Sequence, residues 1–293
     1  MNPAGALALK LVLTPVLVGA ASLAGRRWGS AVGGWLIGIP FTSGPIVLFL
    51  ALDFGQDFAA RAAAGVMAGA ISQAAFCVAY AWTAQRWGWA VSLMAAAAGF
   101  AAVTVVLYAS ALPGAGSFVV VIVALVVSLF LMPQSTASLS PSRPSGDLRT
   151  RGEELAATAS LGPSRLSGDL PVNGEEFRFP IWDLPARMIV ATVFVVVLTM
   201  VAPLLGARLA GLLAPFPLYG SVLAAFAHRV QGAGPAVGVL RGLLLGLFAF
   251  SSFFLVLSLL LARGIALAFA CAIVVALVVH GASLLIGRRV GLA

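Results

Sequence analysis

Apolar residues fill most of this chain in long, nearly uninterrupted stretches. A stretch of about 17–25 apolar residues is long enough to cross a bilayer as a helix. Nine stretches of this kind predict nine transmembrane helices, at about 8–25, 28–52, 58–83, 87–109, 116–132, 187–204, 206–227, 236–261 and 264–286. The pattern therefore predicts an all-α polytopic membrane protein.

The second and seventh stretches are interrupted by proline, glycine and hydroxyl side chains. Residues 38–45 read GIPFTSGP, and residues 215–221 read PFPLYGS. Proline removes a backbone donor and clashes with the preceding helical turn, so each helix should kink or break there. Carbonyl groups freed at that depth need partners, which the nearby hydroxyl groups can supply.

We therefore expect a polar centre where the two interruptions meet. Gln73, near the middle of the third stretch, should also face the bundle interior, because an amide is costly in hydrocarbon. An alternative interpretation is a pair of proline kinks that only ease helix packing. The candidate substrate-binding residues are Pro40, Thr42, Ser43, Gln73, Pro217, Tyr219 and Ser221.

The segment 133–186 differs from the rest because it is rich in Ser, Pro, Gly and charge. It contains a tandem duplication, in which PSRPSGDL at 141–148 returns as PSRLSGDL at 163–170. A repeat without a hydrophobic face cannot bury a core, so this segment predicts a disordered cytosolic linker. A protein partner could bind through it.

A larger repeat relates the two halves of the chain at an offset of 177 positions (217 − 40). At this offset Pro40 aligns with Pro217, and glycines align without a gap, because Gly29, Gly34, Gly55, Gly65 and Gly69 meet Gly206, Gly211, Gly232, Gly242 and Gly246. Coinciding glycines and a proline mark special backbone positions and mean more than alanine matches would, although chance alignment of apolar runs is the alternative. Five helices separate equivalent positions, so the two copies should cross the membrane in opposite directions.

This repeat predicts two inverted four-helix repeats joined by one linking helix. Residues 1–110 form the first repeat, 111–132 the linking helix, 133–186 the linker and 187–293 the second repeat. The plan is similar to that of secondary transporters built from inverted repeats, in which interrupted helices at corresponding positions mark the binding site. The similarity is one of architecture and identifies no family.

Composition and charge place the chain in a membrane and orient it. Hydrophobic residues make up 61% and charged residues 9%, far from the soluble norm of roughly a quarter charged. The formal charge of +8 indicates topology and anionic lipid headgroups rather than nucleic acid. With the N-terminus outside and the C-terminus cytoplasmic, most arginines fall in inner loops. Arginine in place of lysine, with much Ala and Gly, points to a bacterial inner (plasma) membrane.

Isolated polar and sulfur-containing residues carry weaker signals. His280 lies inside a predicted span and is a candidate for proton coupling, although a packing role is the commoner one. Lys10 should snorkel to the interface, and His228 should be solvated in a cytosolic turn. Cys77 and Cys271 read as small apolar residues. No catalytic motif, metal-ligand cluster or cofactor motif is present, so we expect no enzyme, no metal and no cofactor.

Two functions remain open after this reasoning. The first is a secondary-transporter-like protein that moves a small molecule or a lipid precursor, with an anionic substrate modestly favoured. The second is a non-catalytic membrane component that binds or scaffolds a protein partner. An isolated apolar groove without a watered central cavity would favour the second.

Overall fold

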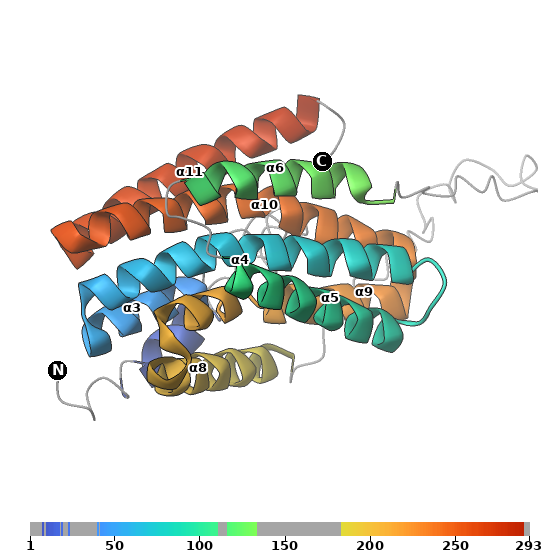
Figure 1. Cartoon of the computed structure of the whole chain (residues 1–293). Coiled ribbons are helices and arrows are strands. Elements are labelled where there is room, and N and C mark those ends of the chain that lie inside the picture. Colours follow the sequence, from blue (N-terminus) through green and yellow to red (C-terminus); the bar gives the residue numbers. More distant parts are fainter. Residues whose placement is uncertain are drawn as a thin grey trace, which may run out of the picture. The chain divides into compact units, whose positions relative to one another are not determined.

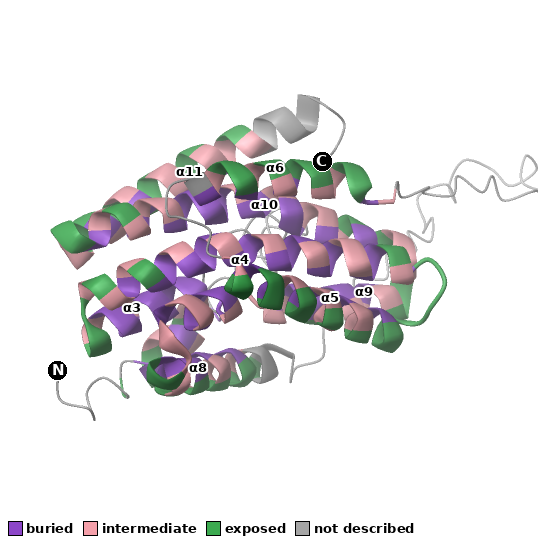
Figure 2. Cartoon of the chain, in the orientation of Figure 1, coloured by how far each residue is buried: buried purple, intermediate pink, exposed green. Residues whose placement is uncertain are grey.

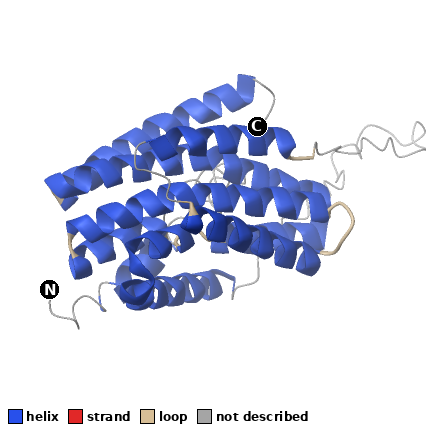
Figure 3. Cartoon of the chain, in the orientation of Figure 1, coloured by secondary structure: helices blue, strands red, loops and turns tan. Residues whose placement is uncertain are grey.

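The computed structural model describes residues 42–110, 116–133 and 183–289, together with Pro40 and a few positions between 8 and 23. Over this part of the chain the regular structure is helical, as Figure 3 shows. Most of the first predicted span, the start of the second, and the duplication in the linker lie outside the described residues.

Eight α-helices and one 3₁₀ helix are described. In chain order they are α3 (Ser43–Phe54), α4 (Gln56–Thr83), α5 (Trp89–Ala109), α6 (Gly116–Leu131), α8 (Asp183–Leu213), α9 (Leu218–Gln231), α10 (Ala233–Leu260), the 3₁₀ helix η2 (Leu261–Arg263) and α11 (Ile265–Arg289). All of them belong to one unit of the chain.

Five of these helical segments are long and apolar enough to cross a membrane: Gln56–Thr83, Trp89–Ala109, Met188–Leu213, Ala233–Arg263 and Ile265–Ser283. The segments Ser43–Phe54 and Ser117–Leu131 are apolar but shorter. These helices support the predicted multi-pass membrane class.

The structure departs from nine full spans in three places. The fifth predicted span is the 16-residue helix α6, about 24 Å long at 1.5 Å per residue, whereas a hydrocarbon core is about 30 Å thick. The helix predicted at 28–52 begins only at Ser43 within the described residues. The span predicted at 206–227 is two short helices, because proline and glycine interrupt it.

Helix α8 extends beyond its predicted apolar span at the N-terminal end. Helix α8 begins at Asp183, inside the predicted linker 133–186. Pro185 stands in its first turn, where a backbone N–H has no helical partner, so proline is tolerated there.

Helices α4 and α10 form the interior of the described bundle. They pack against each other, and α4 also packs against α3, α5, α6 and α8. About two thirds of the apolar window of α4 is buried (67%), against 17% in α11. Figure 2 shows the same contrast, with buried positions concentrated in α4 and α10. The peripheral helices therefore leave apolar faces exposed, as expected where lipid is the solvent.

The two inner helices have matching geometry. Each contains 28 residues and follows a glycine with a positive φ, 87° at Gly55 and 93° at Gly232. These glycines connect α3 to α4 and α9 to α10 without a longer loop, which a left-handed conformation at glycine permits. Figure 1 shows that α4 and α10 run in opposite directions along their contact.

Candidate functional site: the junction of two interrupted helices

The second interruption consists of two places at which the helix stops, Gly206 and residues 214–217. Gly206 has a φ of 76° and ends the first part of α8, and a short helix follows as far as Leu213. Residues 214–217 are not helical, and α9 begins at Leu218. The paired prolines explain this break, because neither Pro215 nor Pro217 can donate the backbone hydrogen bond that would continue the helix.

Backbone hydrogen bonds at the two interruptions are similar. The carbonyl of Pro40 accepts a hydrogen bond from the N–H of Gly44 at 2.8 Å, and the carbonyl of Pro217 accepts one from the N–H of Ser221 at 2.7 Å. Both prolines are buried. Each proline thus accepts a backbone hydrogen bond from the first turn of the helix that follows, although Pro217 is the N-cap of α9 whereas the N-cap of α3 is Thr42.

A buried hydrogen bond joins the two interruptions. The hydroxyl of Ser43 donates to the carbonyl of Ala214 at 2.9 Å across 171 positions of sequence. Ser43 is 2% exposed and Ala214 is fully buried. The carbonyl of Ala214 precedes Pro215 in the non-helical backbone, so a side chain supplies one of the partners that the broken helix lacks. We call the contact of residues 40–45 with 211–217 the junction.

Glycine allows α4 to approach the junction at backbone distance. A Cβ atom added to Gly211 would lie 2.2 Å from the carbonyl oxygen of Ala62, and one added to Gly69 would lie 2.5 Å from Cγ of Pro215. A Cβ on Gly65 would lie 2.7 Å from the carbonyl oxygen of Arg208. The Gly65-x-x-x-Gly69 face of α4 therefore packs closely, and its partner is the short helix before the break.

Gln73 lies on the face of α4 that is turned toward the junction. Gly69 and Phe76, four positions before and three after it, both contact the broken segment, and residues at these spacings share a helix face. The Phe76 ring packs edge-on against Phe216 at 6.1 Å between centroids. The Gln73 side chain is 6% exposed, and its Oε1 has no hydrogen-bond partner within the described residues. It is therefore available to a polar ligand or to water.

The other predicted residues occupy less central positions. Thr42 is the half-buried residue before α3 and makes no side-chain cap, and Tyr219 is half-buried in the first turn of α9. Ser221 bonds within its own turn, to the carbonyl of Leu218 at 2.9 Å. His280 is buried in α11, which packs on α10 rather than on the helices that form the junction.

The helix starts at the junction offer few backbone N–H groups to a ligand. In α3, Gly44 and Ile46 donate to the carbonyls of Pro40 and Thr42, and Pro45 has no N–H. In α9, Leu218 and Ser221 likewise donate to backbone carbonyls. The partial positive charge of a helix start depends on unsatisfied N–H groups, so the structural support for an anionic substrate is weaker than the sequence suggested.

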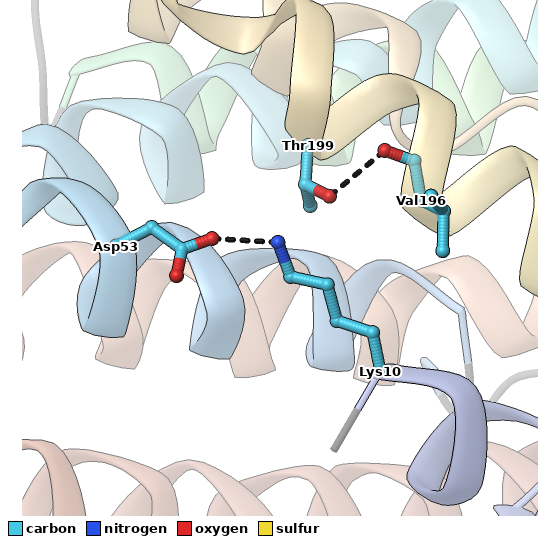
Figure 4. Close-up of polar contacts among 4 residues, drawn as sticks. All are labelled: Lys10, Asp53, Val196 and Thr199. Atoms are coloured by element: carbon cyan, nitrogen blue, oxygen red, sulfur yellow. Dashed lines mark hydrogen bonds and ion pairs between the residues drawn. The ribbon is translucent and has the colours of Figure 1, made fainter. Parts of the chain in front are cut away.

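The structure pairs a residue that the sequence placed at the lipid interface. Lys10 is 7% exposed, and its Nζ donates to Oδ2 of Asp53 at 2.6 Å (Figure 4). The same Nζ lies 5.6 Å from the centre of the Phe49 ring. Lys10 therefore does not snorkel, because a carboxylate 43 positions away and an aromatic face compensate its charge inside the protein. A basic residue in one apolar run and an acid at the end of the next is the sequence signal for this pair.

His228 was predicted to be solvated, and this prediction was wrong. It is half-buried, and its Nδ1 lies within hydrogen-bond distance of the Tyr80 hydroxyl, at 3.3 Å. The two rings also meet edge to face at 5.9 Å between centroids. His228 lies beyond the candidate spans, and its partial burial lowers the pKa of the imidazole. The lower pKa favours the neutral ring, whose free nitrogen can accept a hydrogen bond from the tyrosine hydroxyl.

Other polar groups hold helices together. Thr104 donates to Ser72 between α5 and α4 at 2.9 Å, which is the helix-to-helix role expected for such residues. Arg208 donates to the carbonyls of Leu107 and Ser110 at the end of α5. Cys77 is buried and Cys271 half-buried, and neither forms a disulfide.

No family model, curated protein or solved structure matches the chain. The described helices thus define a class, a helical protein with five candidate membrane spans, in which the start of α3 meets the break between α8 and α9 inside the bundle.

Proposed function

We propose that the chain consists of two inverted repeats. The matched features support this: α3 and α9 both end one residue before a glycine of positive φ, and α4 and α10 have equal lengths. Pro40 and Pro217, at the same offset, each accept a hydrogen bond from the first turn of the next helix. The opposite directions of α4 and α10 agree with an inverted arrangement (Figure 1).

On this architecture we propose a secondary-transporter-like function in a bacterial inner membrane. The observation that supports it most is the bond from Ser43 to the carbonyl of Ala214, because it joins the start of α3 to the break before α9 inside the bundle. Broken helices at the interface of inverted repeats are the usual place for a substrate site, since exposed backbone groups there can bind polar ligands. The substrate would be a small molecule or a lipid precursor.

In this proposal the junction is the substrate site in its closed state. Opening would separate Ser43 from Ala214 and free one hydroxyl and one carbonyl, next to the amide of Gln73. These three groups offer both donors and acceptors, which suits a neutral polar or weakly anionic group. Phe216, packed against Phe76 and Phe100, would keep the site apart from the surrounding helices.

Cysteine labelling tests this function. Cysteines replace Ser43 and Tyr219 one at a time, in a protein whose Cys77 and Cys271 are replaced by alanine. Both sites should react with a small, water-soluble thiol reagent, and a bound substrate should slow the reaction. Val123, which is 55% exposed on α6, gives the lipid-facing control that should stay unreactive. Equal inertness at all three positions would favour a non-catalytic component that binds a protein partner.

Topology reporters test the inverted arrangement separately. With the N-terminus outside, fusions at Gly146 and Ala293 should report the cytoplasm, and a fusion at Gly114 should report the exterior. An exterior signal at Gly146 would contradict opposite directions for the two copies, whatever the labelling experiment shows.

A further inference from the structure

The short helices α3 and α9, which we call half-helices because each begins at an interruption, are each held near the C-terminal end by a long-range side-chain contact. For α3 this contact is Lys10 to Asp53, 2.6 Å between Nζ and Oδ2. For α9 it is Tyr80 to His228, at 3.3 Å. Each half-helix therefore has one end at the junction and the other held to a different segment of the chain.

The pair on α3 does not serve the stability of that helix. Asp53 lies in the last turn of α3, where a negative charge opposes the helix dipole. Its side chain is 21% exposed, so water or headgroups can reach it, whereas the Lys10 side chain is 9% exposed. Figure 4 shows Lys10 extending from the N-terminal segment toward α3. The ion pair thus joins the N-terminal segment to α3, and it can separate because water reaches the Asp53 carboxylate.

The pair on α9 is neutral and combines a hydrogen bond with a ring contact. Tyr80 is fully buried in the last turn of α4, and His228 stands in the last turn of α9. Near them, Trp82 donates to the carbonyl of Leu131 at 2.9 Å, so the end of α6 lies at the same end of the bundle.

The two fastenings lie at opposite ends of the bundle. Asp53 precedes the glycine turn at the start of α4, and Tyr80 lies at the end of the same 28-residue helix. A helix of that length spans about 42 Å at 1.5 Å per residue, more than a hydrocarbon core. In the proposed topology the Asp53 end is outside and the His228 end is cytoplasmic.

We infer that these two contacts are the gates of the proposed transporter. Lys10 and Asp53 form the outer gate, and Tyr80 and His228 form the inner gate. The inference rests on the proposed function and adds its conformational control: each gate releases one half-helix from one side of the membrane, so the junction opens to that side while the other contact holds. Alternating access requires two conformations, one in which the site is open to the outside and one in which it is open to the cytoplasm.

The experiment measures from which side the junction can be reached. Gln73→Cys, in the background without Cys77 and Cys271, places the reporter at the junction and leaves the Ser43 bond intact. A membrane-impermeant thiol reagent is added to right-side-out and to inside-out vesicles. The double variant Lys10→Met with Asp53→Asn removes both charges together, so that no unpaired charge is left buried. Tyr80→Phe removes one hydroxyl group.

Opening the outer gate should raise the labelling rate in right-side-out vesicles about fivefold and lower it in inside-out vesicles, because a weak polar contact shifts a two-state equilibrium by roughly that factor. Tyr80→Phe should do the reverse. Matched controls at the same ends are Arg61→Gln, which removes an exposed charge, and Thr83→Val, whose hydroxyl bonds only within its own helix. Both should leave the rates unchanged.

Labelling that rises equally from both sides, or not at all, in the gate variants would overturn the inference. A reporter that reacts in the parent protein but shows no change of side would leave the transporter proposal standing without these gates. A reporter that stays inert in every variant would remove the transporter proposal itself. Thermal melting of each variant in detergent shows whether it is folded, and the charge exchange Lys10→Asp with Asp53→Lys should restore the parent ratio of rates.

Discussion

The half-helices α3 and α9 show how one backbone plan can be held in place by different side chains. Both follow a buried proline whose carbonyl accepts a hydrogen bond from the first turn of the helix, and both end at a glycine of positive φ. Their fastenings differ, because α3 is held by an ion pair and α9 by a tyrosine and a histidine. Backbone geometry depends on a few glycines and prolines, whereas many polar pairs can hold a helix end.

The largest effect should come from the close packing between α4 and the end of α8, just before the break that leads to α9. Gly211→Ala would place a methyl group 2.2 Å from the carbonyl oxygen of Ala62, and backbone cannot move aside cheaply. We expect a loss of about 3 kcal/mol in the free energy of unfolding, and a lower melting temperature in detergent. Gly238→Ala on α10 has open space at its Cβ and should be neutral or slightly stabilising.

The glycine that aligns with Gly211 in the first copy tests whether the two copies pack alike. Gly34 aligns with Gly211 in the repeat and lies outside the described residues. If the two copies pack alike, Gly34→Ala should lower the melting temperature about as much as Gly211→Ala does. A neutral result for Gly34→Ala would mean that the copies differ at this step.

The turn glycines should give the next largest effect, and it should be equal in the two copies. Gly55→Ala and Gly232→Ala force a side chain into a positive-φ conformation with extended ψ, which costs roughly 1–3 kcal/mol. Thermal melting should therefore show similar losses for both. Gly88→Ala is the control, because Gly88 has an ordinary extended backbone and open space at its Cβ. A loss at only one of the two glycines would break the equivalence of α3 and α9.

The smallest effect should come from the serines that follow the two prolines. Ser43→Ala removes a buried bond across the junction and should cost about 1 kcal/mol, because the carbonyl of Ala214 loses its partner. Ser221→Ala removes only a bond to the carbonyl of Leu218 in the same turn. This variant should therefore lower the melting temperature of the protein less than Ser43→Ala does. Equal effects would indicate that the bond of Ser43 does not hold the junction closed.

The sequence alone determined the membrane class, the positions of α4, α5, α10 and α11, and the break at Pro215 and Pro217. Lipid imposes long apolar helices, and proline or glycine limits the backbone locally, so both are legible without tertiary information. For this reason the ends of α4 and α5 lay within two residues of the predicted ones. Helix α8 begins at Asp183, four residues before its predicted apolar span, because proline is tolerated in a first turn.

Only the tertiary structure decided which polar groups meet. Ser43 finds Ala214 across 171 positions, Tyr80 finds His228 across 148, and Lys10 finds Asp53 across 43. A buried polar group must find a partner, but its identity depends on how helices far apart in sequence pack together. The sequence could therefore predict that Lys10 and His228 need compensation or water, and only the packing of the helices showed which of the two each residue received.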